Sequence, residues 1–415
     1  MDKSNYIVPE FGPLRGIRVI GAGSLIAMPF AATMMADFGA EVIQIERPRI
    51  GDTYRSFPPF KTTGQGTAGS SWIQDARNRL SMTLELDLSD PDVKEIFYKL
   101  IAQSDIFVEN MVWLEKLGID DKELLKINPR LIIVHISGYG HKEFGGKPEI
   151  CDQASYDMIG QAYSGYALFN GYPEKDPLIV KPSLGDYITA LFALFGMLAA
   201  YIDAKNTGHG QVVDVAQFES MARVMRDAFT MSSLGLAEVQ RCGTKAIGFQ
   251  PYDLFKSSDG VHVSIGAVGK VVFERFMNAA GFDLEKYPYE KTSKNKEAVN
   301  SPEGRELGRL INEWCLSHTA DEIEEAMHRG RVPCARVNDA QEETLFKDKI
   351  ATKEIKKLLQ ESEQAEKDFF ENIANPIFSW NEETVKNIFE QNNFSCLYKS
   401  AFILEKRKIS VPETE

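Results

Sequence analysis

The stretch from Pro182 to Tyr187 contains one acidic residue, Asp186, directly before an apolar segment. A proline and a glycine precede this acid, so the pattern predicts a helix over residues 187–201 with Asp186 at its start. Unpaired backbone N–H groups and the positive end of the helix dipole favour an ionised carboxylate there. Such an aspartate often only caps its helix, which is worth about 1 kcal/mol. A carboxylate held in a dry cleft can also act as a nucleophile, and the rest of the chain must decide between the two roles.

The composition describes an acidic protein with enough apolar residues for well-packed cores. The chain has 415 residues, of which 43% are hydrophobic and 26% charged, and its formal net charge is −13. This length allows two domains, and the negative charge argues against nucleic acid as a partner. No window approaches the ~18 apolar residues of a membrane helix, residues 191–202 being the longest candidate. The first residues also lack a signal-peptide pattern, so we expect no membrane contact.

Cysteine and histidine are both scattered along the chain. The five cysteines include no CxxC pair, and the six histidines include no HExxH motif and no pair at ligand spacing. This pattern predicts reduced thiols in a cytoplasmic protein, with no disulfide framework and no metal site.

The first 140 residues alternate between strands and helices. Residues 16–23 and 40–46 read as strands on either side of a helix that Ser24 could cap, which is a βαβ unit. Further strands at 105–110 and 131–136 end in polar residues, a usual place for ligand contacts in parallel sheets. We therefore predict an α/β fold with a doubly wound parallel sheet.

A nicotinamide-dependent oxidoreductase is one alternative for this fold. Glu46 ends the second strand about where a ribose-binding acid would lie. However, Ile26 stands where the third glycine of the dinucleotide motif should allow close packing, and Pro29 follows in the first helical turn. The pattern argues against NAD, and no redox cofactor is expected.

The predicted order of strands and helices changes after residue 232. Two short apolar runs flank Ser257-Ser258-Asp259-Gly260, which predicts a hairpin with a glycine turn. Helices are expected at 270–280, 302–317 and 319–328, so this part should form a smaller α+β domain. The expected organisation is a large domain over 1–220 with a C-terminal return at about 372–415, a small domain over 225–330, and a linker over 331–371.

Residues 44–79 carry a local basic surplus in this acidic chain. Six arginine and lysine residues face three acidic residues there. Most of these side chains would be solvated, but one or two of them could bind phosphate.

Ordered motifs along the chain resemble those of the class III CoA-transferases. They are LRGIRVI, AMPFAATMMADFGAEVIQIERP, RNRLS, DIFVEN, INPRLIIVHISGYG, SYDMIGQAYSGY, LGDY and TGHGQVVDVAQFES. The resemblance covers roughly residues 11–340 and is closest to the branch of L-carnitine and bile-acid CoA-transferases. It implies a large Rossmann-like domain and a small domain joined by long linkers, in two chains that interlock as a homodimer.

The resemblance also implies a covalent mechanism centred on Asp186. The carboxylate attacks an acyl-CoA thioester to give a mixed anhydride and CoA thiolate, and the thiolate then returns to form an aspartyl-CoA thioester. A free carboxylic acid resolves this thioester. One thioester replaces another, so no ATP and no metal are required.

The same resemblance implies a set of coenzyme A contacts. They are Arg47 and Lys116 for the phosphates, Leu84, Asn110 and Met111 for the adenosine, and Ser155 and Tyr156 for the pantetheine arm. The turn after Asn110 is two residues shorter than in the family, which leaves the reach of Lys116 open.

The acid that receives CoA is expected to be bulky. Ile26 replaces a glutamine that aids formyl transfer in relatives, so formyl and oxalyl groups are disfavoured. Met28, Tyr139, Phe249 and Tyr252 could form an apolar acyl pocket, although each could equally be a core residue.

Two further functions stay open from the sequence. An α-methylacyl-CoA racemase would need a histidine where this chain has Tyr156, and tyrosine with a pKa of ~10 is a poor base. A non-catalytic CoA-binding relative is the second possibility, because the segment from Ser379 onward lacks the family's usual helix start.

Overall fold

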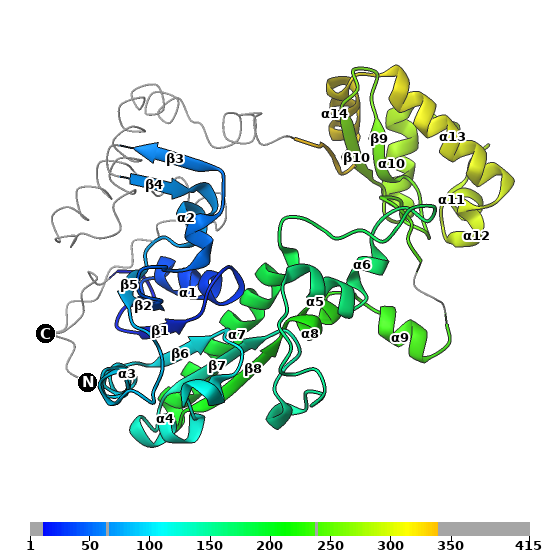
Figure 1. Ribbon diagram of the computed structural model, residues 1–415. Coiled ribbons are helices and arrows are strands. Elements are labelled where there is room, and N and C mark those ends of the chain that lie inside the picture. The colour runs from blue at the N-terminus through cyan, green and yellow to red at the C-terminus, as the bar shows by residue number, and fades with distance from the viewer. Residues whose placement is uncertain (1–10, 64–65, 237–239, 339–415) are drawn as a thin grey trace, which may run out of the picture. The chain divides into compact units, whose positions relative to one another are not determined.

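The computed structural model describes residues 11–63, 66–236 and 240–338 of the chain. These residues divide into two compact units, one of residues 11–167 and 179–236 and one of residues 168–178 and 240–338 (Figure 1). The second unit thus differs from the expected small domain, because it includes residues 168–178 and extends past residue 330. The expected C-terminal return lies outside the described residues.

A six-stranded sheet organises the first unit. Its order is β5-β2-β1-β6-β7-β8, and every neighbouring pair is parallel. The predicted parallel α/β sheet is therefore confirmed. The strand order reverses between β1 and β6, which is where open α/β sheets usually bind ligands. The strands are β1 (Arg18–Ala22), β2 (Glu41–Glu46), β5 (Leu80–Thr83), β6 (Ile106–Glu109), β7 (Ile132–Ser137) and β8 (Gln211–Ala216).

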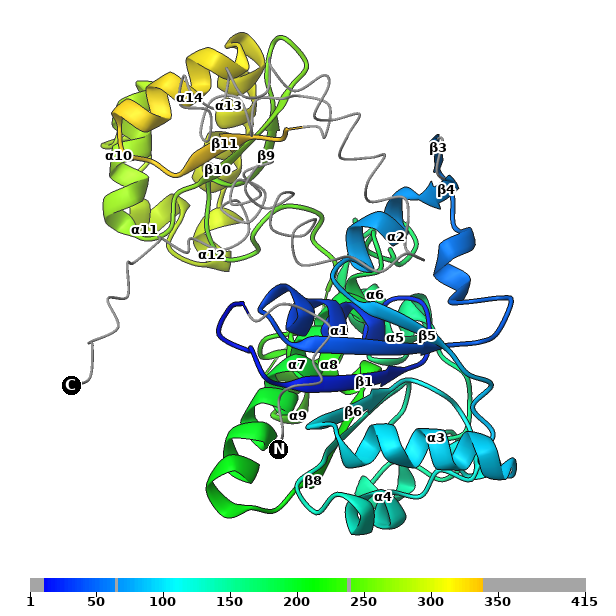
Figure 2. The ribbon, with the colours of Figure 1, turned by 90° about the vertical axis from the view of Figure 1, so that its left-hand side faces the viewer.

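Helices cover both faces of this sheet (Figure 2). Along β6, Ile106 and Val108 belong to the core cluster on one face, while Phe107 belongs to the cluster on the other. This alternation is the two-residue period of a strand buried on both sides. The first face packs against α1 (Ala27–Asp37) and α7 (Leu184–Thr207), and the second against α3 (Pro91–Ala102) and α4 (Asp121–Ile127).

Helix α7 is long and apolar enough to cross a membrane by length and composition, with a mean hydropathy of 1.6. This corrects the expectation that no segment approaches that limit. In this structure one side of the helix packs on the sheet through four alanines and one methionine, namely Ala190, Ala193, Met197, Ala200 and Ala204. The other side of the helix exposes large apolar residues, among them Leu191, Phe195 and Ile202.

Residues with positive φ separate two pairs of short helices in this part of the chain. Gly165, with a φ of 85°, lies between α5 and α6 in a conformation that glycine adopts readily. Arg226, with a φ of 56°, lies between α8 and α9. The remaining elements between β2 and β9 are β3 (Phe60–Thr63), β4 (Gly66–Gly69), α2 (Ser70–Asp75), α5 (Asp157–Tyr163), α6 (Tyr166–Phe169), α8 (Gln217–Arg223) and α9 (Ala228–Ser233).

The second unit combines a small antiparallel sheet with helices. Its sheet order is β11-β10-β9, and the expected hairpin pairs Phe255 with Val263. The side chains of Ser301 and Thr319 cap the helices that begin at Pro302 and Ala320. Each side chain accepts a hydrogen bond from a backbone N–H in the first turn, which explains where these helices begin. The elements are β9 (Tyr252–Lys256), β10 (His262–Gly266), α10 (Lys270–Ala280), α11 (Tyr289–Thr292), α12 (Lys296–Val299), α13 (Pro302–Ser317), α14 (Ala320–Arg329) and β11 (Cys334–Arg336).

Candidate active site

Asp186 lies inside the first turn of α7 and does not cap it. The helix begins at Leu184, three residues before the start expected at residue 187. The acid that reaches the helix terminus is Asp157, whose Oδ1 accepts from the backbone N–H of Gly185 at 2.7 Å. Asp157 therefore takes the capping role that the sequence assigned to Asp186, and the Asp186 carboxylate is left available for other contacts.

Gln217 supplies the hydrogen bond that holds Asp186. Its Nε2 donates to Oδ1 of Asp186 at 2.6 Å, while its Oε1 accepts from the Ser155 hydroxyl at 3.1 Å. Because the Ser155 contact occupies the oxygen end of the amide, the nitrogen end faces the carboxylate. Sequence reasoning missed Gln217, although a polar residue directly after a parallel strand could have been noted.

The surroundings of Asp186 disfavour its charged form. Burial, joined by repulsion from Asp157 and opposed by the Gln217 hydrogen bond, raises the pKa of Asp186 to about 7. This corrects the expectation that the helix start would favour ionisation there. Desolvation outweighs the favourable helix terminus, and a carboxylate that titrates near neutrality is typical of functional sites.

Asp186 lies on the wall of a cavity of about 590 Å³, within the range of small-molecule sites. The cavity lies at the carboxyl ends of β1, β6 and β7, beside the reversal of the strand order. Seven of the residues singled out from the sequence line it, namely Ile26, Asn110, Met111, Lys116, Ser155, Tyr156 and Asp186.

Asn110 holds one edge of the cavity in place. Its Oδ1 accepts from the backbone N–H of Ser24 at 3.1 Å, and its Nδ2 donates to the Ser24 carbonyl at 3.0 Å. Gly23 makes this approach possible, since a Cβ there would come within 1.8 Å of the Asn110 oxygen. Both ends of the Asn110 amide are thus engaged with the loop after β1.

Lys116 reaches the cavity despite the shortened turn before it. Its Nζ lies 4.5 Å from the ring centroid of Trp113, a cation–π contact, and both residues line the cavity. The side chain is therefore placed where an anionic group could meet it.

Four other residues predicted for the site lie elsewhere. Met28 is fully buried in the core under α1, and Tyr139 packs edge-on against Tyr163 with ring centroids 5.0 Å apart. Leu84 packs against the core on the other face of the sheet. Arg47 is exposed, with its Nε 3.9 Å from Glu85. Packing partners that the sequence does not reveal account for the first three positions.

The remaining members of the expected acyl pocket belong to the second unit. Phe249 and Tyr252 contact each other in the second unit, with ring centroids 5.2 Å apart and nearly perpendicular planes. Apolar lining of the cavity instead comes from Leu25, Ile26 and Val112.

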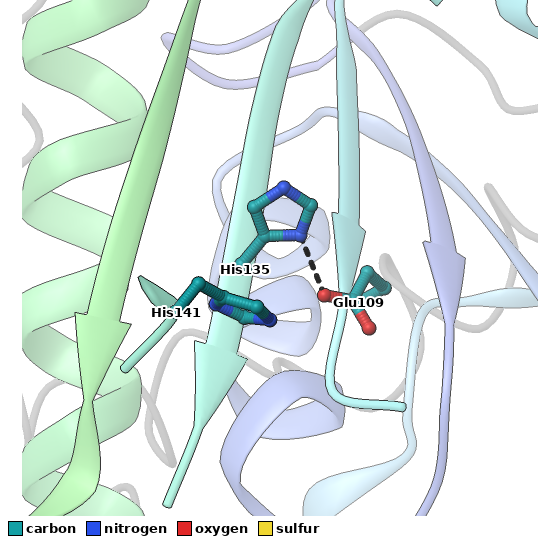
Figure 3. Close-up of side chains that lie close together, drawn as sticks. All are labelled: Glu109, His135 and His141. Atoms are coloured by element: carbon teal, nitrogen blue, oxygen red, sulfur yellow. Dashed lines mark hydrogen bonds and ion pairs between the residues drawn. The ribbon is translucent and has the colours of Figure 1, made fainter. Parts of the chain in front are cut away.

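A cluster of ionisable residues that the sequence did not indicate lies beside the cavity (Figure 3). His135 Nδ1 lies 2.7 Å from Oε1 of Glu109, and its Nε2 lies 2.9 Å from Oδ2 of Asp121. Burial lowers the pKa of His135, but the hydrogen bonds to these two acids outweigh it and raise the pKa to about 10. The neighbouring His141 ring, 4.9 Å away between centroids, lines the cavity.

Comparison with known sequences finds CoA-transferases. A model of CoA-transferase family III matches residues 14–387. The bile acid CoA-transferase BaiK of Clostridium scindens is 37% identical over 345 residues, covering 79% of this chain and 72% of the relative. The beta subunit of a succinyl-CoA–L-malate CoA-transferase of Chloroflexus aurantiacus is 32% identical and covers 79% of this chain and 78% of its own length.

Comparison with solved structures finds proteins that share this fold. A CAIB/BAIF family protein from Brucella suis has a TM-score of 0.68 at 25% identity, over 80% of this chain and 86% of that one. A Mycobacterium tuberculosis protein has the same fold, with a TM-score of 0.68 at 22% identity over 81% of this chain and 87% of its own.

Proposed function

The chain belongs to CoA-transferase family III, and from this premise we propose that it moves CoA from an acyl-CoA donor to a free carboxylic acid through Asp186. The observation that carries the proposal is the placement of this carboxylate. It lies on the cavity wall, and Gln217 holds one of its oxygens at 2.6 Å. A nucleophile oriented in this way needs little further ordering before attack.

The proposed reaction has four balanced steps. A carboxylate oxygen of Asp186 attacks the thioester carbonyl, the C–S bond breaks, and a mixed anhydride and CoA thiolate result. The thiolate attacks the aspartyl carbon of the anhydride, which releases the donor acid and leaves an aspartyl-CoA thioester. The acceptor carboxylate displaces this thiolate to form a second anhydride. Attack of the thiolate on the acceptor carbonyl then yields the new acyl-CoA and regenerates Asp186.

Coenzyme A is a substrate in this scheme, and the cavity offers groups that suit it. Lys116 supplies a cation, Met111 an apolar surface, and Ser155 a hydroxyl, and all three line the cavity. We propose that the phosphates of CoA lie toward Lys116 and that the pantetheine arm runs past Ser155 and Tyr156 toward Asp186.

The acceptor is proposed to be a bulky acid such as a carnitine, a bile acid or a similar carboxylate. Leu25, Ile26 and Val112 present aliphatic side chains to the cavity, and apolar lining favours ligands with apolar bodies. The 37% identical relative is a bile acid CoA-transferase, while the 32% identical one is named for malate. Both bulky and small carboxylic acids are therefore candidate acceptors.

We also propose that the active form is a homodimer, interlocked as in the family. The support is the exposed apolar side of α7, where Leu191, Phe195 and Ile202 have exposed fractions of 46%, 74% and 61%. Apolar patches of this kind commonly mark protein–protein interfaces.

Trapping the aspartyl thioester tests the proposed mechanism. The enzyme is incubated with an acyl-CoA and hydroxylamine, and the peptide that contains Asp186 is analysed by mass spectrometry. A hydroxamate at Asp186 is expected, and Asp186→Ala should abolish both the adduct and transfer. A screen of donors against carnitine, bile-acid and dicarboxylate acceptors then identifies the acid.

The same experiment separates the competing functions. A racemase would exchange the α-proton of a 2-methylacyl-CoA without forming the hydroxamate, and a non-catalytic CoA-binding protein would do neither. Transfer by Asp186→Ala at nearly the wild-type rate would remove Asp186 from the proposed role.

A further inference from the structure

Three neighbouring strands bring their ionisable residues into one row beside the cavity. In the sheet register, Glu109 of β6 is the partner of His135 of β7, and His135 is the partner of Asp214 of β8. His141 follows β7 on the next loop. Ligating atoms of Glu109, His135 and His141 all lie within 4.8 Å of one another (Figure 3).

Each of the two histidines has one ring nitrogen fixed by a carboxylate outside this trio. Nε2 of His135 lies 2.9 Å from Asp121, and Nδ1 of His141 lies 2.6 Å from Asp214. A carboxylate on the far nitrogen of a histidine fixes the ring orientation and makes the other nitrogen more basic. That pairing is the usual outer shell of a metal-binding histidine.

We propose that Glu109, His135 and His141 bind one divalent transition metal ion of the zinc type. Two imidazole nitrogens and one carboxylate oxygen form a donor set that suits zinc or cobalt better than magnesium or calcium. Three protein ligands leave a fourth position for water or an anionic group. His141 and its loop line the cavity, so the site lies next to the space assigned to the substrates.

The geometry requires only a local adjustment. Ligand atoms in a tetrahedral zinc site lie roughly 3.3 Å apart, given bonds of about 2.0–2.1 Å. Glu109 and His135 are already 2.7 Å apart, so they need to separate slightly, while the His141 ring moves inward. Glu109 is also held from behind, since its Oε2 accepts from the backbone N–H of Met111 at 2.6 Å.

Charge favours the same assignment. The cluster contains three carboxylates, Glu109, Asp121 and Asp214, against two imidazoles. Glu109 and His135 are almost entirely buried. A bound dication would offset two of the negative charges of these carboxylates, and buried charges require such compensation.

Cobalt binding to the full-length, tag-free protein tests the site. Co²⁺ is titrated after chelator treatment, with visible absorption and calorimetry as readouts, and Zn²⁺ is then added in competition. We expect one Co²⁺ per chain with the absorption bands of tetrahedral cobalt, displaced by one Zn²⁺. His141→Ala should abolish these bands, and His209→Ala, an exposed histidine outside the cluster, should leave them unchanged.

Asp214→Asn provides a milder variant in case His141→Ala disturbs folding. It keeps the shape of the side chain while weakening its hold on His141, and loss of such an outer-shell carboxylate lowers metal affinity about 10–100-fold. Absence of cobalt bands in the wild type, or equal affinity in His141→Ala, would overturn the assignment. None of these readouts involves turnover, so the result is independent of hydroxylamine trapping at Asp186.

Discussion

At the scale of single residues, Asp157 and Asp186 have different roles in the site. Asp157 accepts the N–H of Gly185 at 2.7 Å and also the amide of Gln161 at 2.9 Å. Asp186 has one amide donor, Gln217, at 2.6 Å. The two carboxylates are close enough for Asp157 to contribute to the raised pKa of Asp186. One acid thus stabilises the helix start, and the other stays near the midpoint of its titration at neutral pH.

The rate of enzyme acylation should therefore depend on pH. With the pKa of Asp186 raised to about 7, the nucleophilic carboxylate becomes fully available only above that pH. We expect the single-turnover rate to rise tenfold per pH unit below 7 and to level off above it. Asp157→Asn removes the like charge and should move the midpoint to lower pH. An unchanged midpoint would show that burial alone sets it.

The same shift predicts that Asp186 reduces stability above neutral pH. A carboxyl group with a folded pKa above its unfolded value favours the folded state most at low pH, and this contribution is lost as pH rises from 3.8 to about 7. At about 1.4 kcal/mol per pKa unit, the loss is a few kcal/mol. Asp186→Asn should raise Tm at pH 8 by roughly 2–4 °C per kcal/mol. At pH 4 this difference should nearly vanish, and Asp176→Asn, at an exposed site, should show none.

At the scale of elements, close approach of helices sets the position of Gln217. Helix α8 begins at this residue directly after β8, and its side chain crosses to α5 at Gly160. A Cβ at Gly160 would lie 2.6 Å from the Gln217 side chain, which is closer than real contacts allow. The glycine therefore allows the amide to lie between α5 and Asp186.

Gly160→Ala should consequently impair catalysis in the same way as Gln217→Leu. Displacement of the amide removes a hydrogen bond to a charged group, worth about 1.5–3 kcal/mol, so acylation should fall about tenfold or more. Its pH midpoint should rise, because the Gln217 bond lowers the pKa of Asp186. Stopped-flow release of CoA measures both effects. Gly248→Ala, at a glycine without a positive φ where a Cβ would meet no atom within 4 Å, is the matched control for added bulk.

At the scale of the whole molecule, α7 packs on the core with one side and exposes large apolar residues on the other. One side of this helix belongs to the core under the sheet. The other side presents Leu191, Phe195 and Ile202 at positions that share a helix face. This arrangement explains how a helix with the hydropathy of a membrane span serves in a fold of this kind.

Phe195→Glu should prevent the interlocked dimer from assembling while the two chains fold, and this should leave monomers. A charge in an apolar interface is costly unless it is paired, and Phe195 is 74% exposed in the single chain. Light scattering coupled to gel filtration measures the mass. Ile96→Glu, at a 43% exposed position on α3, should leave the mass unchanged. A monomeric wild type, or a variant that stays dimeric, would contradict a dimer interface at α7.

The sequence by itself determined the elements and singled out Asp186. Local periodicity located four of the six parallel strands and the hairpin, and helices α10 and α13 begin and end as expected, because caps and prolines act within a few residues. The ordered motifs indicated CoA transfer. The cytoplasmic location and the specific coenzyme contacts remain predictions, and the expectation that the chain has no metal site competes with the site proposed at Glu109, His135 and His141.

Only the tertiary structure decided which groups surround Asp186. Asp157 is 28 residues from the N–H that it caps, Gln217 is 31 residues from Asp186, and His141 is 73 residues from Asp214. No local pattern records such pairs, because parallel strands and their crossovers bring distant segments to one edge of the sheet. Burial, which reversed the expected direction of the Asp186 pKa, is likewise a property of the packed fold and not of the helix start alone.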